Sequence, residues 1–167
     1  MRKGSHMSSI ETLPTKGIYT LIIFLSEEAR LSVGKLGMQK FPKGYYTYTG
    51  SALGKGATSL KQRVSRHVQK RKRNLWHIDF LLAKENATVT AVVAARTNKK
   101  LECAVNRYIK REGKAKIPVK GFGSSDCKEN CGSHLLYFGE EEVKSKIATF
   151  YAKRLGSKPF TIDFAYE

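Results

Sequence analysis

The sequence predicts an α/β domain of the α+β type, built on a central, mainly antiparallel three-stranded sheet with helices on its flanks. Three observations favour this fold class. Residues 17–25 are an unbroken β-branched and aromatic run, as in a buried strand. Two more short strand patterns follow closely, and strands that are neighbours in sequence pair most simply as an antiparallel meander. Later segments carry apolar residues at helical spacing.

The expected elements follow in chain order. Strands are predicted over residues 17–25, 30–36 and 45–49, with a turn at Phe41-Pro42-Lys43-Gly44 before the third. A Gly-rich loop then leads to a helix from Thr58 or Ser59 to about Lys72, since either hydroxyl can cap it. The other expected elements are helices over 75–84, 99–112 and 140–155 and strands over 88–95, 134–138 and 159–164.

Length and composition indicate one domain. A chain of 167 residues with 41% hydrophobic residues can bury a core without disulfides. Residues 1–6 are typical of a cloning remnant, which leaves 7–167 as a single domain, with its core at about 17–138 and a C-terminal helix and strand at about 140–164. No apolar run is long enough for a membrane span. Three cysteines and no secretory pattern predict a cytoplasmic protein.

Basic residues concentrate in one part of the chain. The formal net charge is +17, and the 50 residues between Glu28 and Asp79 hold twelve Lys or Arg and no acidic residue. Such a block creates a strong positive potential, and no amphipathic apolar face accompanies it. Nucleic acid, above all DNA, is therefore the expected partner, with a merely soluble basic surface as the alternative. The residues expected to bind it are Lys55, Lys61, Arg66, Lys70, Arg71, Lys72, Arg73 and His77.

Two expected helices carry polar residues beside an apolar stripe. On the first, Arg63 and His67 lie four residues apart and border the stripe, whereas Arg66 is expected to face solvent. On the second, Glu102 and Asn106 border the stripe. A carboxylate and an amide one turn apart suit a hard divalent cation. A plain surface pair and a helix-start carboxylate are the structural alternatives.

Two polar residues stand near the start of the helix expected at 75–84. His77 and Asp79 could cap this helix or contact a phosphate from its first turn. Capping is the preferred interpretation.

The cysteines allow three interpretations. Cys127 and Cys131 are followed by His134, with Cys103 as a candidate fourth zinc ligand. The spacing C-x3-C-x2-H is not a strong zinc pattern, and helical geometry turns Cys103 away from the main stripe of its helix. Buried free thiols are therefore preferred over structural zinc. A redox-sensitive pair is the third interpretation, and His134 could instead serve the active site.

Two triplets carry a resemblance to a known family. Gly17-Ile18-Tyr19 opens the first strand and Tyr48-Thr49-Gly50 ends a later one, which resembles the paired signature of the GIY-YIG nuclease superfamily. Thr49 replaces the usual Ile, but in a strand it should point away from Tyr48. The spacer between the triplets is longer than in the compact members, because the hairpin over 30–44 is extended.

The resemblance continues beyond the triplets. Residues 59–63 (SLKQR) match the segment that carries the helix-borne Arg, and His67 and Glu102 fall at matching positions. The similarity spans about residues 17–138. Residues 44–82 look still closer to a little-characterised stand-alone subgroup of GIY-YIG-like proteins.

The resemblance implies a small GIY-YIG-like domain that acts as a metal-dependent endonuclease on DNA or structured nucleic acid, in repair or processing. Tyr19 would deprotonate the attacking water, with Tyr48 beside it, and Arg63 would neutralise the phosphoryl charge. Glu102 would hold one Mg²⁺ or Mn²⁺. A phenol acts as a base only where positive charge lowers its pKa, for which Arg63, His67 and the metal are the available sources.

Two other functions fit the same residues. A nucleic-acid-binding module with this fold and little or no catalysis would need only the basic face. A zinc-stabilised protein-interaction domain would need only the cysteines and His134. Retention of the two tyrosines, Arg63 and Glu102 favours the enzyme.

Overall fold

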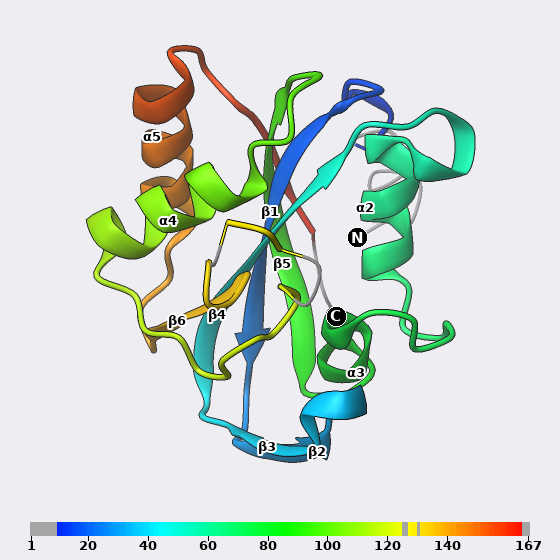
Figure 1. Ribbon diagram of the computed structural model, residues 1–167, viewed down its shortest axis with the longest axis vertical. Coiled ribbons are helices and arrows are strands. Elements are labelled where there is room, and N and C mark those ends of the chain that lie inside the picture. Colours follow the sequence, from blue (N-terminus) through cyan, green and yellow to red (C-terminus); the bar gives the residue numbers. More distant parts are fainter. Residues whose placement is uncertain (1–9, 125–126, 130, 165–167) are drawn as a thin grey trace.

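The computed structural model describes residues 10–124, 127–129 and 131–164. Residues 1–6, the expected cloning remnant, lie outside the described residues. The main element is a five-stranded sheet in the order β6-β4-β1-β5-β7, in which all neighbouring strands are antiparallel (Figure 1). Its strands are β1 (Gly17–Leu25), β4 (Gly44–Ala52), β5 (Ala87–Arg96), β6 (Leu135–Gly139) and β7 (Phe160–Asp163).

The expected three-stranded meander is wrong in both the number and the order of its strands. β2 (Ala29–Ser32) pairs with β3 (Met38–Phe41) in a separate two-stranded sheet, joined through a short 3-10 helix at Gly34–Leu36. β1 lies instead between β4 and β5, which pair with it along its full length. Nearly all of β1 is buried, so it needs long partners on both edges, which the four-residue, half-exposed β2 cannot supply.

Helices cover both faces of the main sheet (Figure 1). α2 (Leu60–Val68) and α3 (His77–Leu82) lie on one face, and α4 (Glu102–Gly113) and α5 (Lys144–Leu155) lie on the other. Alternation along β1 sends Tyr19 and Leu21 into the core beneath α2 and α3, and Ile18 and Ile22 into the core beneath α4 and α5. The helices and strands expected after residue 50 are thus confirmed in type, with ends shifted by a few residues.

The start of α2 follows the expected capping chemistry. The Ser59 hydroxyl accepts a hydrogen bond from the Gln62 backbone N–H at 3.4 Å. The helix ends at Val68, before the basic run at 70–73, rather than at Lys72.

One edge of β4 is only half paired. β6 covers Tyr45 to Tyr48 of β4, and beyond them the Thr49 N–H bonds the His134 carbonyl at 3.2 Å. The first turn of α4 reaches this uncovered end, where the Ser51 hydroxyl donates to Glu102. A gap in strand pairing therefore brings β4, α4 and the segment before β6 together.

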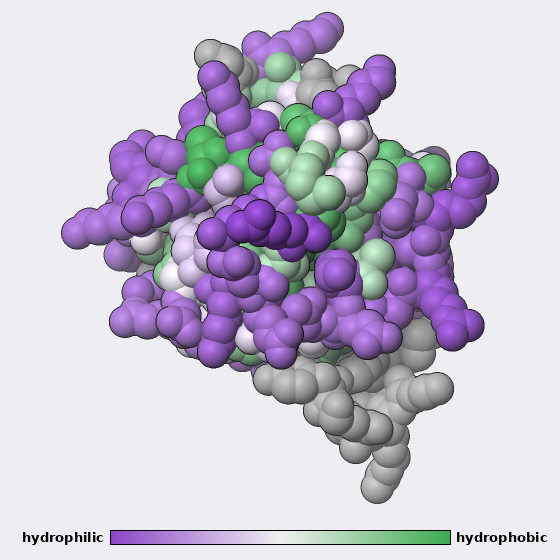
Figure 2. Space-filling model, turned by 90° about the horizontal axis from the view of Figure 1, so that it is seen from below, coloured by the Kyte–Doolittle hydropathy of each residue, from purple (hydrophilic) through white to green (hydrophobic). Residues whose placement is uncertain are grey.

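The face of the molecule seen from below is predominantly polar (Figure 2). Hydrophilic side chains cover most of the face shown in Figure 2, and hydrophobic residues gather there in smaller patches. Within the described part of the chain, every helix is too short or too polar to cross a membrane.

Candidate functional site

A cleft of about 510 Å³ lies at the half-paired edge of β4. It is lined by side chains from β1, β4, α2, the first turn of α4 and the segment that precedes β6. Four of the five candidate catalytic residues line it: Tyr19, Tyr48, Arg63 and Glu102. His67, the fifth, lies buried behind Tyr19.

Packing explains the glycines of both triplets. Gly50 lies opposite Tyr19 in the β1–β4 register, and a Cβ there would lie 2.6 Å from the Tyr19 hydroxyl oxygen. A Cβ on Gly17 would lie 2.3 Å from the Ala95 carbonyl oxygen of β5. Thr49 points to the other face, where its hydroxyl bonds Thr20 at 2.8 Å. The expectation that Thr49 leaves the site undisturbed is therefore confirmed in its geometry.

Tyr19 and His67 form a buried pair. The Tyr19 hydroxyl lies 2.8 Å from His67 Nε2, and the two side chains are 2% and 1% exposed. Burial lowers the pKa of His67 to about 3, so its imidazole is neutral at neutral pH, and its tautomer decides which of the two atoms donates in this hydrogen bond. His67 is therefore not a source of positive charge, contrary to the expectation from sequence.

Burial also controls both phenols. It raises the pKa of Tyr19 well above its usual value, and the negative charge of a Tyr48 phenolate would raise it further, although Arg63 acts in the opposite direction. Burial raises the pKa of Tyr48 to about 12. The expected lowering of the tyrosine pKa by the neighbouring charge of Arg63 is thus outweighed by desolvation.

Arg63 is held in the cleft from two sides. Its Nη1 donates to the Ser51 carbonyl oxygen at 3.2 Å, on the free edge of β4. Its guanidinium carbon lies 4.9 Å from the ring centroid of Trp76. Arg66 lies on the same indole at 4.5 Å. The guanidinium thereby keeps most of its donors for a ligand.

Glu102 is more buried than a helix-edge position suggests. Its residue is 8% exposed, and its Oε1 accepts a hydrogen bond from the Ser51 hydroxyl at 2.7 Å. The exposed Lys100 ammonium lies 4.0 Å from Oε2. Asn106, the proposed second oxygen donor, is buried and donates to the Ser133 carbonyl oxygen at 2.6 Å. The structure thus brings Glu102 to the cleft and uses the Asn106 amide group to hold the segment before β6.

Arg66 does not face solvent as expected. It forms two hydrogen bonds with the carboxylate of Asp79, at 2.9 and 2.8 Å, and Asp79 has no exposed surface. Asp79 Oδ2 also accepts the backbone N–H groups of Leu75 and Trp76, each at 2.9 Å, so the capping interpretation is confirmed for this residue. Burial alone would raise the pKa of Asp79, but these hydrogen bonds lower it below its usual value.

The other basic candidates divide into two groups. Lys70 donates to the carbonyl oxygens of Leu82, Lys84 and Ala87 around the end of α3, and Lys72 donates to those of His67 and Gln69. Burial lowers the pKa of both ammonium groups. Lys61 lies 3.7 Å from Glu11, and His77 Nδ1 accepts the Gly123 N–H at 2.8 Å. The candidates exposed on the surface are Lys55, Lys70, Arg71 and Arg73, and of these Lys70 is the one that the carbonyl contacts above hold.

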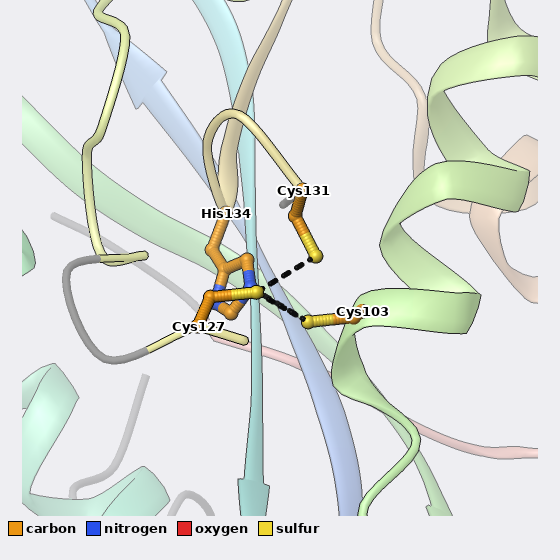
Figure 3. Close-up of side chains that lie close together, drawn as sticks. All are labelled: Cys103, Cys127, Cys131 and His134. Atoms are coloured by element: carbon orange, nitrogen blue, oxygen red, sulfur yellow. Dashed lines mark hydrogen bonds between the residues drawn. The ribbon is translucent and has the colours of Figure 1, made fainter. Parts of the chain in front are cut away.

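The cysteines meet at the rim of the cleft. One ligand atom each from Cys103, Cys127, Cys131 and His134 lies within 4.8 Å of the other three, so the group could hold a metal ion (Figure 3). The argument that Cys103 faces away is wrong, because the segment before β6 folds over that side of α4. Burial tends to raise the pKa of Cys127, but hydrogen bonds, first from Cys103, lower it to about 7. The donor set of the cluster favours a zinc-type ion over Mg²⁺, and the three cysteines are free thiols in the structure.

Three residues that contact Arg63 or Glu102 in the cleft were not predicted as site residues from the sequence. Ser51, Trp76 and Lys100 line the cleft and contact Arg63 or Glu102. Ser51 directly follows the second triplet, which was its only signal. Trp76 is visible as the sole tryptophan beside His77, but nothing local indicates that it lies against Arg63.

Fold and site together define an α+β domain with a polar cleft at a sheet edge and a Cys/His cluster at the rim. The chain belongs to the family described as Domain of unknown function DUF123, whose model matches residues 18–155. This match runs from β1 through α5 and so includes every element that lines the cleft. No curated protein and no solved structure matches the chain.

Proposed function

We propose that the chain is a divalent-metal-dependent endonuclease that hydrolyses phosphodiester bonds in DNA or structured nucleic acid. One observation carries the proposal. Tyr19, Tyr48, Arg63 and Glu102 come from four different elements, and all four line one cleft. The resemblance to the GIY-YIG superfamily selects the same four residues from the sequence. A water activator, a phosphate-binding guanidinium and a carboxylate are the groups that this reaction needs.

Tyr19 positions and deprotonates the attacking water. In the His67 tautomer with its proton on Nδ1, the Tyr19 hydroxyl donates to Nε2, and its oxygen can accept a hydrogen bond from a water in the cleft. Tyr19 then need not exist as a stable phenolate: it takes a proton from the water as it passes its own to His67 Nε2. A phosphodiester that enters beside the pair adds negative charge, which raises the pKa of His67 and favours this transfer.

Arg63 binds the phosphoryl oxygens. One of its N–H groups is used by the Ser51 carbonyl, and the others are available to a phosphate in planar, two-point contact. The indole of Trp76 supports one side of the guanidinium and limits its movement. Charge that develops on the phosphoryl group in the transition state is thereby met by a positioned cation.

Glu102 is the residue that would hold Mg²⁺ or Mn²⁺. The donor set fits such an ion, because the carboxylate lines the cleft and Ser51 orients one of its oxygens while the other pairs only loosely with Lys100. The bound ion supplies charge neutralisation at the phosphate and the leaving oxygen.

A nucleic-acid-binding module with little or no catalysis is the second candidate. One observation favours it: burial raises the pKa of both Tyr19 and Tyr48, which opposes base catalysis before substrate binds. Binding would then use Arg63 and the exposed basic residues without chemistry.

A nicking assay separates these two functions. We expect the wild-type chain to nick supercoiled plasmid with Mn²⁺ or Mg²⁺ and not with EDTA. Arg63→Ala should lower the rate by about 100-fold or more, because it removes a transition-state contact. Arg30→Ala, which removes an exposed charge on β2, should leave it near wild type. Failure of the wild type to cut plasmid, branched DNA or RNA with either metal would overturn the enzyme in favour of the binding module.

Binding to duplex DNA should depend strongly on salt. Each phosphate that the chain neutralises releases counterions, so log affinity should fall against log salt with a slope of about −0.9 per contact. We expect a slope that corresponds to several phosphate contacts with the basic surface. Fluorescence anisotropy over a salt series measures this slope. Arg71→Ala/Arg73→Ala should make the slope shallower, whereas a wild-type slope near zero would remove nucleic acid as the partner.

A further inference from the structure

We propose that Cys103, Cys127, Cys131 and His134 bind one zinc ion, which fixes the segment before β6 against α4 and so builds one wall of the cleft. The proposal does not rest on nuclease activity, because it concerns the cluster itself.

The ligand atoms are already arranged around a common point. Cys127 Sγ lies 3.1 Å from Cys103 Sγ and 3.3 Å from Cys131 Sγ, and His134 Nε2 lies 3.4 Å from Cys103 Sγ. Around tetrahedral zinc, bond lengths of ~2.3 Å to sulfur and ~2.0 Å to nitrogen place ligand atoms about 3.5 to 3.8 Å apart. The three pairs above would move slightly apart, and the four ligand atoms, which all lie within 4.8 Å of one another, would adjust by small shifts to admit the ion.

The chemistry of the donors selects zinc over magnesium. Three thiols and one imidazole are soft or borderline ligands, whereas Mg²⁺ prefers oxygen. With all four positions filled by protein, the site is closed and has no place for a reactive water. It is therefore distinct in composition and role from the carboxylate at Glu102.

A single disulfide explains the arrangement less well. Figure 3 shows the Cys127 sulfur joined by dashed lines to those of both Cys103 and Cys131, and the two distances differ by only 0.2 Å, at 3.1 and 3.3 Å. A disulfide would join two of the three cysteines and would not involve the third thiol or His134. A shared metal ion uses all four side chains.

The surroundings match the charge of such a site. Three thiolates and a neutral imidazole around Zn²⁺ leave one net negative charge. Arg107, one turn after Cys103 on α4, donates from Nη1 to Cys131 Sγ at 3.7 Å and from Nη2 to Glu129 at 3.3 Å, so it brings a cation to the site that it shares with this carboxylate. Cys103, Cys131 and His134 are 5%, 8% and 7% exposed, so the ion would be shielded from competing solvent ligands.

The position of the cluster gives the ion its structural effect. Apart from turns and one bridge at Lys116, residues 114–134 form no regular structure where they are described. Cys103 directly follows Glu102, and Cys103, Cys127 and His134 line the cleft with it. A zinc ion here would tie the irregular segment to the first turn of α4, beside the carboxylate.

Metal analysis of the full chain, purified under reducing conditions, tests the inference. We expect about one zinc per chain in the wild type and in the control Glu129→Gln, which alters an exposed neighbouring carboxylate, and less than about a fifth of that in Cys131→Ser. Cobalt-substituted wild type should show the intense visible bands of a tetrahedral site and a thiolate charge-transfer band, a measurement that does not depend on the folding of any variant.

The effect of zinc on the segment before β6 is measured separately, by limited proteolysis. A chelator should speed tryptic cleavage after Lys120 and Lys128, and added zinc should restore protection. Unchanged cleavage would overturn the fixing of the segment. Reduced wild type that takes up neither zinc nor cobalt would overturn the site itself in favour of free thiols, and a mass lower by two hydrogens would assign a disulfide instead.

Discussion

Glu102→Gln should abolish cleavage while leaving the protein folded and able to bind DNA. Gln keeps the size of the side chain and can still accept the Ser51 hydrogen bond, but it lacks the charge that a hard cation needs. We expect the single-turnover rate with Mg²⁺ or Mn²⁺ to fall by roughly 1000-fold or more, because metal catalysis contributes several kcal/mol. Binding should stay the same or tighten, since one negative charge is lost from the cleft.

The cleavage rate of Glu102→Gln must be measured together with its stability and its binding to DNA. Thermal unfolding should place Glu102→Gln within about 1 kcal/mol of the wild type, because the carboxylate is replaced by a group of equal shape. Glu112→Gln, at the exposed C-terminal end of the same helix, is the matched control and should cleave normally. Equal cleavage by Glu102→Gln and the wild type would show that this residue does not hold the catalytic metal.

Among the variants described, Asp79→Ala should cause the largest decrease in the free energy of unfolding. The change removes two hydrogen bonds from Arg66 and two from backbone N–H groups at the start of α3. Loss of one partner of a buried ion pair typically costs about 3 kcal/mol or more, and lost capping adds to it. We expect the denaturant midpoint to fall accordingly, with no change in the slope of the unfolding free energy.

An exposed ion pair provides the control. Glu28→Ala breaks the contact of Glu28 with Lys40, whose side chains are about half exposed, and should change the unfolding free energy by no more than about 0.5 kcal/mol. Because the folded pKa of Asp79 is lowered, its contribution is present at neutral pH and disappears as pH falls below its usual value of 3.8. An Asp79→Ala protein as stable as Glu28→Ala would contradict this account.

The local residue pattern was sufficient to predict which segments form helices and which form strands in most cases. Hydrophobic periodicity and turn residues predicted β1, β4, β5 and the helices from α2 to α5, and Ser59 was one of the two candidate caps, with Thr58, that hydroxyl chemistry indicated. The order of strands was not predictable in the same way. β1 and β5 are separated by more than 60 residues in sequence, and their pairing depends on which long strands can cover a buried central one.

The candidate site shows the same division. Tyr19, Tyr48, Arg63 and Glu102 were identified by residue type and motif order, and the fold adds that they line one cleft. The Arg66–Asp79 pair could not be foreseen, because helical angles describe one helix and not the neighbour that packs against it.

Composition and short-range spacing are enough to establish the basic character of the chain, its element types and the residues able to carry chemistry. The order of the five strands, the Cys/His cluster and the neutral state of His67 arise only in the packed fold. Cys103 reaches Cys127 and Cys131 because an irregular segment folds back over α4. The pKa of His67 depends on how much water the surrounding core excludes. Both are properties of packing between distant parts of the chain, which no local pattern encodes.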